Sequence, residues 1–318
     1  MPPNEPSKQL IDNFGSKIEH HLKSGKFSDY QSGNEVSFIN HTVDLLDGKY
    51  AYDGQQILSV KCKKAHSSPM VTYDRLSSKY GKQHVELGDL LFIFNIWRGK
   101  SIIHRQAFIS QSKCWKKKNP GHIYWEIDQS QFELLDKRPE FRLINSGASV
   151  DHDLTEANGS FYNYSFVSDV HRPFFYQTDD MDSFVDYNYA TPRFYYGQNP
   201  PYGNRYLYAV LKNGLRRRYG SSFRSGDPEY ILLEEIYKYA SLNRSKSPNS
   251  AATYTDGGET QGEFGIINVD VDIGRNKENM DFPPNDERLS EDVEENIEGT
   301  IRDYFTEIDS DGLNFDSI

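Results

Sequence analysis

The sequence predicts an α/β protein, because apolar strands and amphipathic helices both occur along the chain. Residues 86–113 contain two apolar strands that are joined by a short polar turn. Residues 264–274 alternate between apolar and polar side chains, which is the period of a strand. Residues 7–24 and 35–46 instead place apolar side chains at helical spacing, which indicates helices with one apolar face.

Length and composition limit the class of protein. The 318 residues are enough for one large domain or two modest ones. Only 36% of the residues are apolar, so part of the chain is expected to stay outside a core that is rich in aromatic rings. The two cysteines, Cys62 and Cys114, have no metal-binding spacing and imply no disulfide framework, which favours a reducing, cytoplasmic setting. No secretory signal and no membrane span is predicted.

Charge is distributed unevenly along the chain. Residues 251–318 contain 19 acidic and 4 basic side chains, a balance of −15, whereas residues 1–250 contain 28 acidic and 32 basic ones, a balance of +4. Such an asymmetry indicates either work on nucleic acid or an interaction tail, and a merely solubilising tail is the plainer alternative. Residues 275–318 are expected to be a disordered acidic tail.

The first elements follow from caps and periodicity. Asn34 is suited to cap the N-terminus of the helix at 35–46, and Glu35 would lie in the first turn of that helix. Residues 69–80 are expected to be irregular or helical, and the apolar hairpin at 86–113 follows them.

The middle of the chain predicts one more helix and strand. Residues 128–141 are expected to form a helix that stops before Pro139, because the residue that precedes a proline disfavours helical geometry. Residues 141–147 are expected to form a strand. Residues 158–208 are rich in Tyr, Phe, Asn and Pro, which predicts packed loops and short strands.

Two helices are predicted near the C-terminus. Residues 205–220 are expected to form a helix with a basic C-terminal half. Asp227 and Pro228 are suited to begin the second helix, which is acidic at its start and basic at its end. Residues 244–262 are rich in Ser, Asn, Thr and Gly and are expected to form a loop or linker.

Polar side chains at the ends of the hairpin indicate chemistry. Residues 90–96 are continuously apolar, as in a strand that is buried on both faces, and Glu86 and Asp89 precede them. Gln111 and Lys113 are two residues apart on the second strand and therefore share a face, which strand pairing can bring close to Asp89. A carboxylate, a second oxygen ligand and a lysine suit metal-assisted phosphodiester hydrolysis, in which Mg²⁺ polarises phosphate and lysine stabilises developing charge.

This pattern resembles a known family of nucleases. Asp89, a strand and turn, and then Gln111-Ser-Lys113 at the end of the next strand resemble the PD-(D/E)xK, or restriction-endonuclease-like, superfamily. The resemblance is to the Mrr-like variant, in which Gln replaces the acid, and it covers residues 30–145. It implies a restriction-endonuclease-like central mixed sheet flanked by helices. It also implies DNA cleavage that depends on Mg²⁺, with Mn²⁺ as an alternative, in prokaryotic defence against foreign DNA.

The resemblance also implies the ligands of the metal. The superfamily often adds an acid from a helix that precedes the first strand, and Glu35 matches that position better than Glu19 does. The expected metal ligands are therefore Asp89, Glu35 and Gln111, with Glu86 as an additional candidate.

Basic and aromatic side chains are candidates for contacts with DNA. Two basic clusters would neutralise phosphates, with a solvated surface as the alternative reading, and they comprise Lys116, Lys117, Lys118, Arg216, Arg217 and Arg218. Trp115, Trp125 and the Tyr-rich residues 187–208 are able to stack on bases, although such rings more commonly pack in a core or loop.

The expected organisation is a nuclease-like core at 1–150, an aromatic-rich helical region at 151–274 packed on it, and the acidic tail at 275–318. Two other functions stay open. The first is an inactive nuclease-fold protein that binds DNA, which the neutral Gln111 favours. The second is an adaptor in a defence complex that uses the tail as its handle, and the tail would alternatively mimic DNA and cover the basic body. The sequence is compatible with an oligomer.

Overall fold

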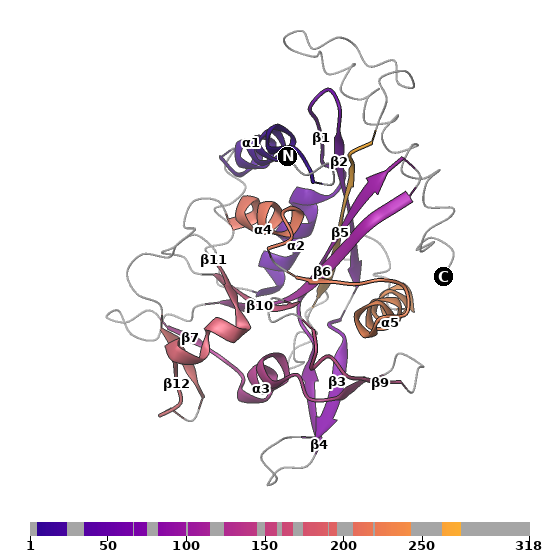
Figure 1. The fold of residues 1–318 in the computed structure, drawn as a ribbon. Helices are drawn as coiled ribbons and strands as arrows, with labels where there is room; N and C mark the ends of the chain where they lie inside the picture. Colours follow the sequence, from indigo (N-terminus) through magenta and orange to yellow (C-terminus); the bar gives the residue numbers. More distant parts are fainter. Residues whose placement is uncertain are drawn as a thin grey trace.

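A mixed sheet forms the centre of the computed structural model (Figure 1). The structure describes residues 5–23, 35–65, 67–74, 82–99, 101–114, 124–144, 150–157, 161–167, 174–189, 191–195, 206–218, 220–242 and 263–274. The acidic tail, the expected linker at 244–262, Trp115 and the cluster Lys116–Lys118 lie outside these residues. Within them, no helix has both the length and the apolar character that a membrane crossing requires.

The central sheet has eight strands, of which seven follow one another in the order β1-β2-β15-β5-β6-β10-β11 and β14 pairs with β6. Their bounds are β1 Tyr50–Tyr52, β2 Ile57–Ala65, β15 Phe264–Asp272, β5 Leu90–Arg98, β6 Ser101–Cys114, β10 Tyr162–Val167, β11 Phe174–Gln177 and β14 Ser221–Ser222. The pairs β15–β5 and β6–β10 are parallel, and the other pairs are antiparallel. The predicted α/β class with a mixed central sheet is therefore confirmed.

Helices cover both faces of this sheet (Figure 1). One face carries α1 (Lys8–Lys23), α2 (Glu35–Leu46) and α4 (Tyr206–Leu215), and the other carries α3 (Gln129–Lys137) and α5 (Pro228–Leu242). Phe92 and Phe94 of β5 pack with the first group, whereas Leu91 and Ile93 pack with the second. The continuous apolar run of this strand is thus buried on both faces, as the sequence predicted.

The strand predicted at the end of the described chain lies in the middle of the sheet. β15 pairs with β2 on one side and β5 on the other, and all nine of its residues are buried. At Gly265 a Cβ atom would lie 2.6 Å from Val43 Cγ2, so a glycine is what allows this strand to pass so close to α2. The central sheet extends across the boundary expected at residue 150, because strands from before and after this residue pair directly with each other.

Two smaller sheets extend the fold. One has the order β4-β3-β8-β9, with β4 Lys82–Glu86, β3 Met70–Asp74, β8 Phe141–Leu143 and β9 Asp151–His152. The other has the order β12-β13-β7, with β12 Val185–Asp186, β13 Arg193–Tyr195 and β7 Tyr124–Glu126. Two short 3₁₀ helices, η3 Thr178–Asp180 and η4 Asp182–Phe184, directly precede β12. The expectation for 69–80 is wrong at β3, where Val71 and Tyr73 alternate into the core.

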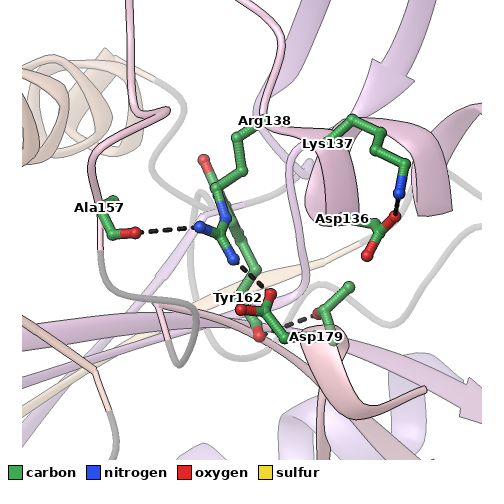
Figure 2. Close-up of polar contacts among 7 residues, drawn as sticks. Asp136, Lys137, Arg138, Ala157, Tyr162 and Asp179 are labelled. Carbon is green, nitrogen blue, oxygen red and sulfur yellow. Dashed lines mark hydrogen bonds and ion pairs between the residues drawn. The ribbon is translucent and has the colours of Figure 1, made fainter. Parts of the chain in front are cut away.

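The predicted helix before Pro139 is α3, and polar contacts fix both of its ends. The Asp128 side chain caps its N-terminus by accepting a hydrogen bond from Gln131 N at 2.8 Å. Arg138 ends it in the left-handed region, with φ of 50°. The Arg138 guanidinium donates to Ala157 O at 3.0 Å and to Asp179 Oδ1 (Figure 2). The position of α3 matters because it carries a side chain of the site described next.

Candidate active site at the open end of the hairpin

The site lies where β5 begins and the antiparallel β6 continues past it. Leu90 pairs with Ser110, so residues 111–114 of β6 extend beyond the neighbouring strand. Ser112 N donates to Asp89 Oδ2 at 2.5 Å, and Cys114 N donates to Glu35 Oε1 at 3.1 Å. Because alternate N–H groups of a strand point to the same side, these two carboxylates lie along one edge of β6.

A chain of side-chain amides starts at the first of these carboxylates. Gln111 Nε2 donates to Asp89 Oδ2 at 2.7 Å and to Ser112 O at 3.3 Å. Gln131 Nε2, from α3, donates to Gln111 Oε1 at 2.6 Å and to Glu86 O at 3.1 Å. A carboxylate oxygen without a proton and a peptide carbonyl can only accept hydrogen bonds, so both amides can be oriented in only one way.

Burial and like charge act together on the acids. Asp89 is 4% exposed, and burial holds the pKa of its carboxyl well above the usual range. Glu35 and Glu86 raise that pKa further, whereas Lys113 and the hydrogen bond from Ser112 lower it. Burial also raises the pKa of Glu86, with Lys113 opposing the shift and Glu35 adding to it. The three acids and Lys113 therefore lie within electrostatic range of one another.

Capping of a strand edge is the purely structural account of Asp89 and Glu35. Both carboxylates do satisfy backbone N–H groups that β5 leaves open. An amide oxygen of Asn or Gln would accept the same hydrogen bonds without burying charge beside another acid. The structural account thus explains the hydrogen bonds but not the choice of acids, and such local conflicts concentrate at functional positions.

The donor set suits a particular kind of metal binding. Among the described residues, no three His, Cys, Asp or Glu side chains lie close enough together to hold a metal ion. Mg²⁺ usually takes one or two protein carboxylates and fills its shell with water and substrate phosphate. In the part of the chain that the structure describes, Asp89 Oδ1 and Glu35 Oε2 accept no hydrogen bond. These residues fit Mg²⁺ held by two carboxylates, but not an all-protein cage.

One role expected from the sequence changes, and one residue of the site was not expected. Gln111 does not offer its oxygen to a metal in this arrangement, because that oxygen accepts a hydrogen bond from Gln131. Gln131 itself was missed by the sequence reasoning. It lies on the same helix face as Leu134 and Leu135, and a polar residue on an apolar helix face is the signal that would have indicated it.

Arg216, Arg217 and Arg218 follow the end of α4 and do not lie beside the carboxylates. Gln106 Nε2 donates to Gly214 O at 3.0 Å, so this end of α4 lies against β6 at residue 106. Seven residues separate Gln106 from Lys113, which is about 23 Å along a strand at roughly 3.3 Å per residue.

The Trp125 ring packs in the core rather than stacking on bases. It is buried against Phe166 and Phe194, and its Nε1 donates to Val167 O at 2.9 Å. Tyr187 and Tyr189 of the Tyr-rich segment are exposed. The Arg193 guanidinium lies 3.6 Å from the centre of the Tyr189 ring, so this ring already has a cationic neighbour within the chain.

Comparisons of the chain with protein-family models, with curated proteins and with solved structures found no match.

Proposed function

We propose that this protein is a Mg²⁺-dependent DNA endonuclease of the PD-(D/E)xK type, acting in prokaryotic defence. The observation that carries the proposal is the set of groups at the open end of β6. Asp89 and Glu35 place two mutually repelling carboxylates on adjacent open N–H groups, with Lys113 in electrostatic range of Asp89. The mixed sheet, and a helix acid that precedes the hairpin in sequence, support the same proposal.

Each residue at this edge has a role in the proposed reaction. Asp89 and Glu35 would hold Mg²⁺ through the oxygens that accept no hydrogen bond among the described residues. When bound, Mg²⁺ would polarise the scissile phosphate and lower the pKa of a bound water. Lys113 is half-buried, and no described carboxylate lies within ion-pair distance of its Nζ. Its ammonium group is therefore available to orient the attacking water and to stabilise charge on phosphorus.

The second candidate is an inactive nuclease-fold protein that binds DNA or serves as an adaptor subunit. The same amide chain favours it, because Gln111 adds no negative charge and its oxygen is occupied by Gln131. The raised pKa of Asp89 acts in the same direction, since a protonated carboxyl holds a divalent cation poorly.

Plasmid cleavage separates these candidates. Supercoiled plasmid is incubated with the protein and Mg²⁺, or Mn²⁺ in parallel, and nicked and linear products are quantified. We expect cleavage by the native chain and at least a hundredfold loss in Asp89→Asn and Lys113→Met. Glu140→Gln changes an exposed acid directly before β8, a strand of a different sheet from β6, and is the matched control. Cleavage that survives both site variants would reject the proposed centre, and DNA binding without any cleavage would favour the second candidate.

A further inference from the structure

We infer that Gln131 is a positioning residue, which acts through Gln111 to hold the Asp89 carboxylate in the orientation that the proposed reaction uses. The inference rests on the proposed function, because Asp89 is one of the two proposed ligands of the ion. It gives a role in the reaction to a side chain of α3 that contacts neither the ion nor the phosphate.

The main chain of Asp89 is fixed by its neighbours in the sheet. Asp89 N donates to Ser110 O at 3.0 Å, and Asp89 O accepts from Gly265 N at 2.9 Å. A Cβ at Gly88 would lie only 2.3 Å from Ile109 Cγ2, so the preceding residue also lies tightly against β6. Because the backbone is held on both sides, only the side-chain torsions of Asp89 remain to be set.

Two donors set the direction of the Asp89 carboxylate. Ser112 N donates to Oδ2 at 2.5 Å, and Gln111 Nε2 donates to the same oxygen at 2.7 Å. The backbone donor is present whatever residue occupies position 112, whereas the second donor requires that Gln111 turn its nitrogen toward Asp89. The reversed amide would bring two acceptors against each other, which cannot form a hydrogen bond. The orientation of the Gln111 amide therefore decides whether it holds the carboxylate or repels it.

Gln131 fixes the orientation of that amide. Its Nε2 donates to Gln111 Oε1 at 2.6 Å and to Glu86 O at 3.1 Å, so both of its hydrogens are used. Glu86 O is a peptide oxygen that can only accept, and it prevents the Gln131 amide from turning. The second hydrogen of Gln111 is used by Ser112 O at 3.3 Å. Donors and acceptors thus follow one another in a single direction from α3 to Asp89.

Aromatic rings lie beside this amide chain, which is buried from solvent. Gln111 is 0% exposed and Gln131 is 4% exposed. Tyr164 of β10 is the strand neighbour of Gln111, and its ring lies 6.3 Å from that of Phe132, the residue after Gln131. The Tyr164 hydroxyl has no hydrogen-bond partner in the described part of the chain, so it does not compete for the amides. Hydrogen bonds between fully satisfied buried groups rigidify the groups that they join.

Glu35 lacks a comparable support. Its carboxylate accepts one hydrogen bond, from Cys114 N at 3.1 Å, and no side chain of the described residues donates to it. Asp89 is therefore the rigid member of the proposed ligand pair, and Glu35 is the member that adjusts to the ion. Because a catalytic group that is misplaced by about 1 Å costs about a hundredfold in rate, loosening Asp89 is expected to affect the reaction directly.

Cleavage kinetics and Mg²⁺ binding of Gln131→Met test the inference. This change keeps the length of the side chain and removes both donors. We expect kcat for plasmid cleavage to fall at least tenfold and the Kd for Mg²⁺, from isothermal titration calorimetry, to weaken at least tenfold, as when other groups that orient metal ligands are removed. The KM for plasmid is expected to stay within about twofold of the native value, because the buried Gln131 does not contact DNA.

Gln111→Met and Tyr237→Phe separate positioning from general stability. If Gln131 acts only through Gln111, the double variant Gln111→Met/Gln131→Met is expected to have the same kcat as Gln111→Met alone. Tyr237→Phe is the matched control, because it also loses a buried hydrogen bond, of 2.6 Å to Asn268, and it is expected to keep the native kcat and Kd. In metal-free protein, the side-chain amide NMR signals of Gln111 are expected to shift in Gln131→Met but not in Tyr237→Phe.

The possible results are distinguishable. Native-like kcat and Kd in Gln131→Met, together with loss of cleavage in Asp89→Asn, would overturn the positioning role and leave the proposed function intact. The same role would be overturned by a further fall of kcat in the double variant, by an equal fall in Tyr237→Phe, or by unshifted Gln111 signals. Absence of both Mg²⁺ binding and cleavage in the native chain would reject the proposed function and this role with it. Thermal unfolding verifies that each variant is folded.

Discussion

Asp89 and Gln111 are joined by a hydrogen bond of 2.7 Å between carboxylate and amide, and both side chains are buried. The pair connects the residue before β5 to the part of β6 that extends beyond the paired residues Leu90 and Ser110. It also links α3 to the carboxylate, since Gln131 of α3 donates a hydrogen bond to the Gln111 side-chain oxygen. The stability and the chemistry of the site are therefore coupled through one polar chain.

Replacing Asp89 by Asn is expected to stabilise the protein while removing Mg²⁺ binding. Asn keeps an oxygen that accepts from Ser112 N and Gln111 Nε2, but it carries no buried charge. Stabilising changes of this kind commonly give about 0.5–2 kcal/mol. Urea denaturation at pH 7 without metal measures the gain, with Glu140→Gln as the exposed control. A clear loss of stability in Asp89→Asn would show that the charge itself holds the strand edge.

The stability of the native chain is expected to decrease with rising pH relative to that of Asp89→Asn. Because the pKa of Asp89 is raised in the folded state, the folded protein binds this proton more tightly than the unfolded chain does. That contribution is fully present below the ordinary carboxyl pKa of about 3.9 and is lost as the pH rises through the raised value. Unfolding free energies from pH 4 to pH 8 measure the difference, and a constant offset between the two proteins would contradict the assignment.

The dependence of Mg²⁺ affinity on pH is expected to have the opposite direction. Binding requires the ionised form of Asp89, so lowering the pH through its raised pKa is expected to weaken Mg²⁺ binding. At and below that pKa, Mg²⁺ binding is expected to release a proton, because the free carboxyl then still carries it. Calorimetry in two buffers of different ionisation enthalpy detects that proton release. Affinity that is unchanged between pH 5.5 and pH 8 would contradict this prediction.

Gln111 and Gln131 are expected to behave as one unit in a double-mutant cycle. Either single change to Met leaves a buried polar partner unsatisfied, at about 1–3 kcal/mol. The double variant is expected to cost less than the sum, with a coupling of about 0.5–3 kcal/mol. Pairing Gln131→Met with Tyr237→Phe, whose hydroxyl bonds Asn268 in a separate contact, provides an additive control. Strict additivity of the two glutamine changes would contradict the amide chain.

Arg138 is expected to stabilise the end of α3 through its side chain and in spite of its backbone. It has φ of 50°, and its guanidinium reaches Ala157 O and Asp179 (Figure 2). Arg138→Gly loses these contacts but suits the left-handed conformation, whereas Arg138→Ala loses them without that relief. We therefore expect stability to fall in the order native, Gly, Ala, with about 1 kcal/mol between the variants. Equal stability of the two variants in urea would contradict this order.

Local patterns were enough to predict helices α1 to α5, the hairpin strands β5 and β6, strand β15 and several of the polar residues at the site, but not the nine-residue strand β2. The apolar run of β5, the spacing of Gln111 and Lys113 and the early position of Glu35 in α2 are all local signals. They led to the expectation that Asp89 lies near Gln111, and the two residues do form a hydrogen bond. β3 was missed because its five residues give only a short alternation.

The sequence by itself determined the helices α1 to α5, the strands β5, β6 and β15, and which of their faces are apolar, because these depend on periodicity within a few residues. Only the tertiary structure decided that β15 lies between β2 and β5, and that Gly265 passes against Val43 of α2. It also decided that Gln131 reaches Gln111 and thereby turns the Gln111 oxygen away from Asp89. Strand order and amide orientation depend on partners far apart in sequence, which local periodicity does not encode.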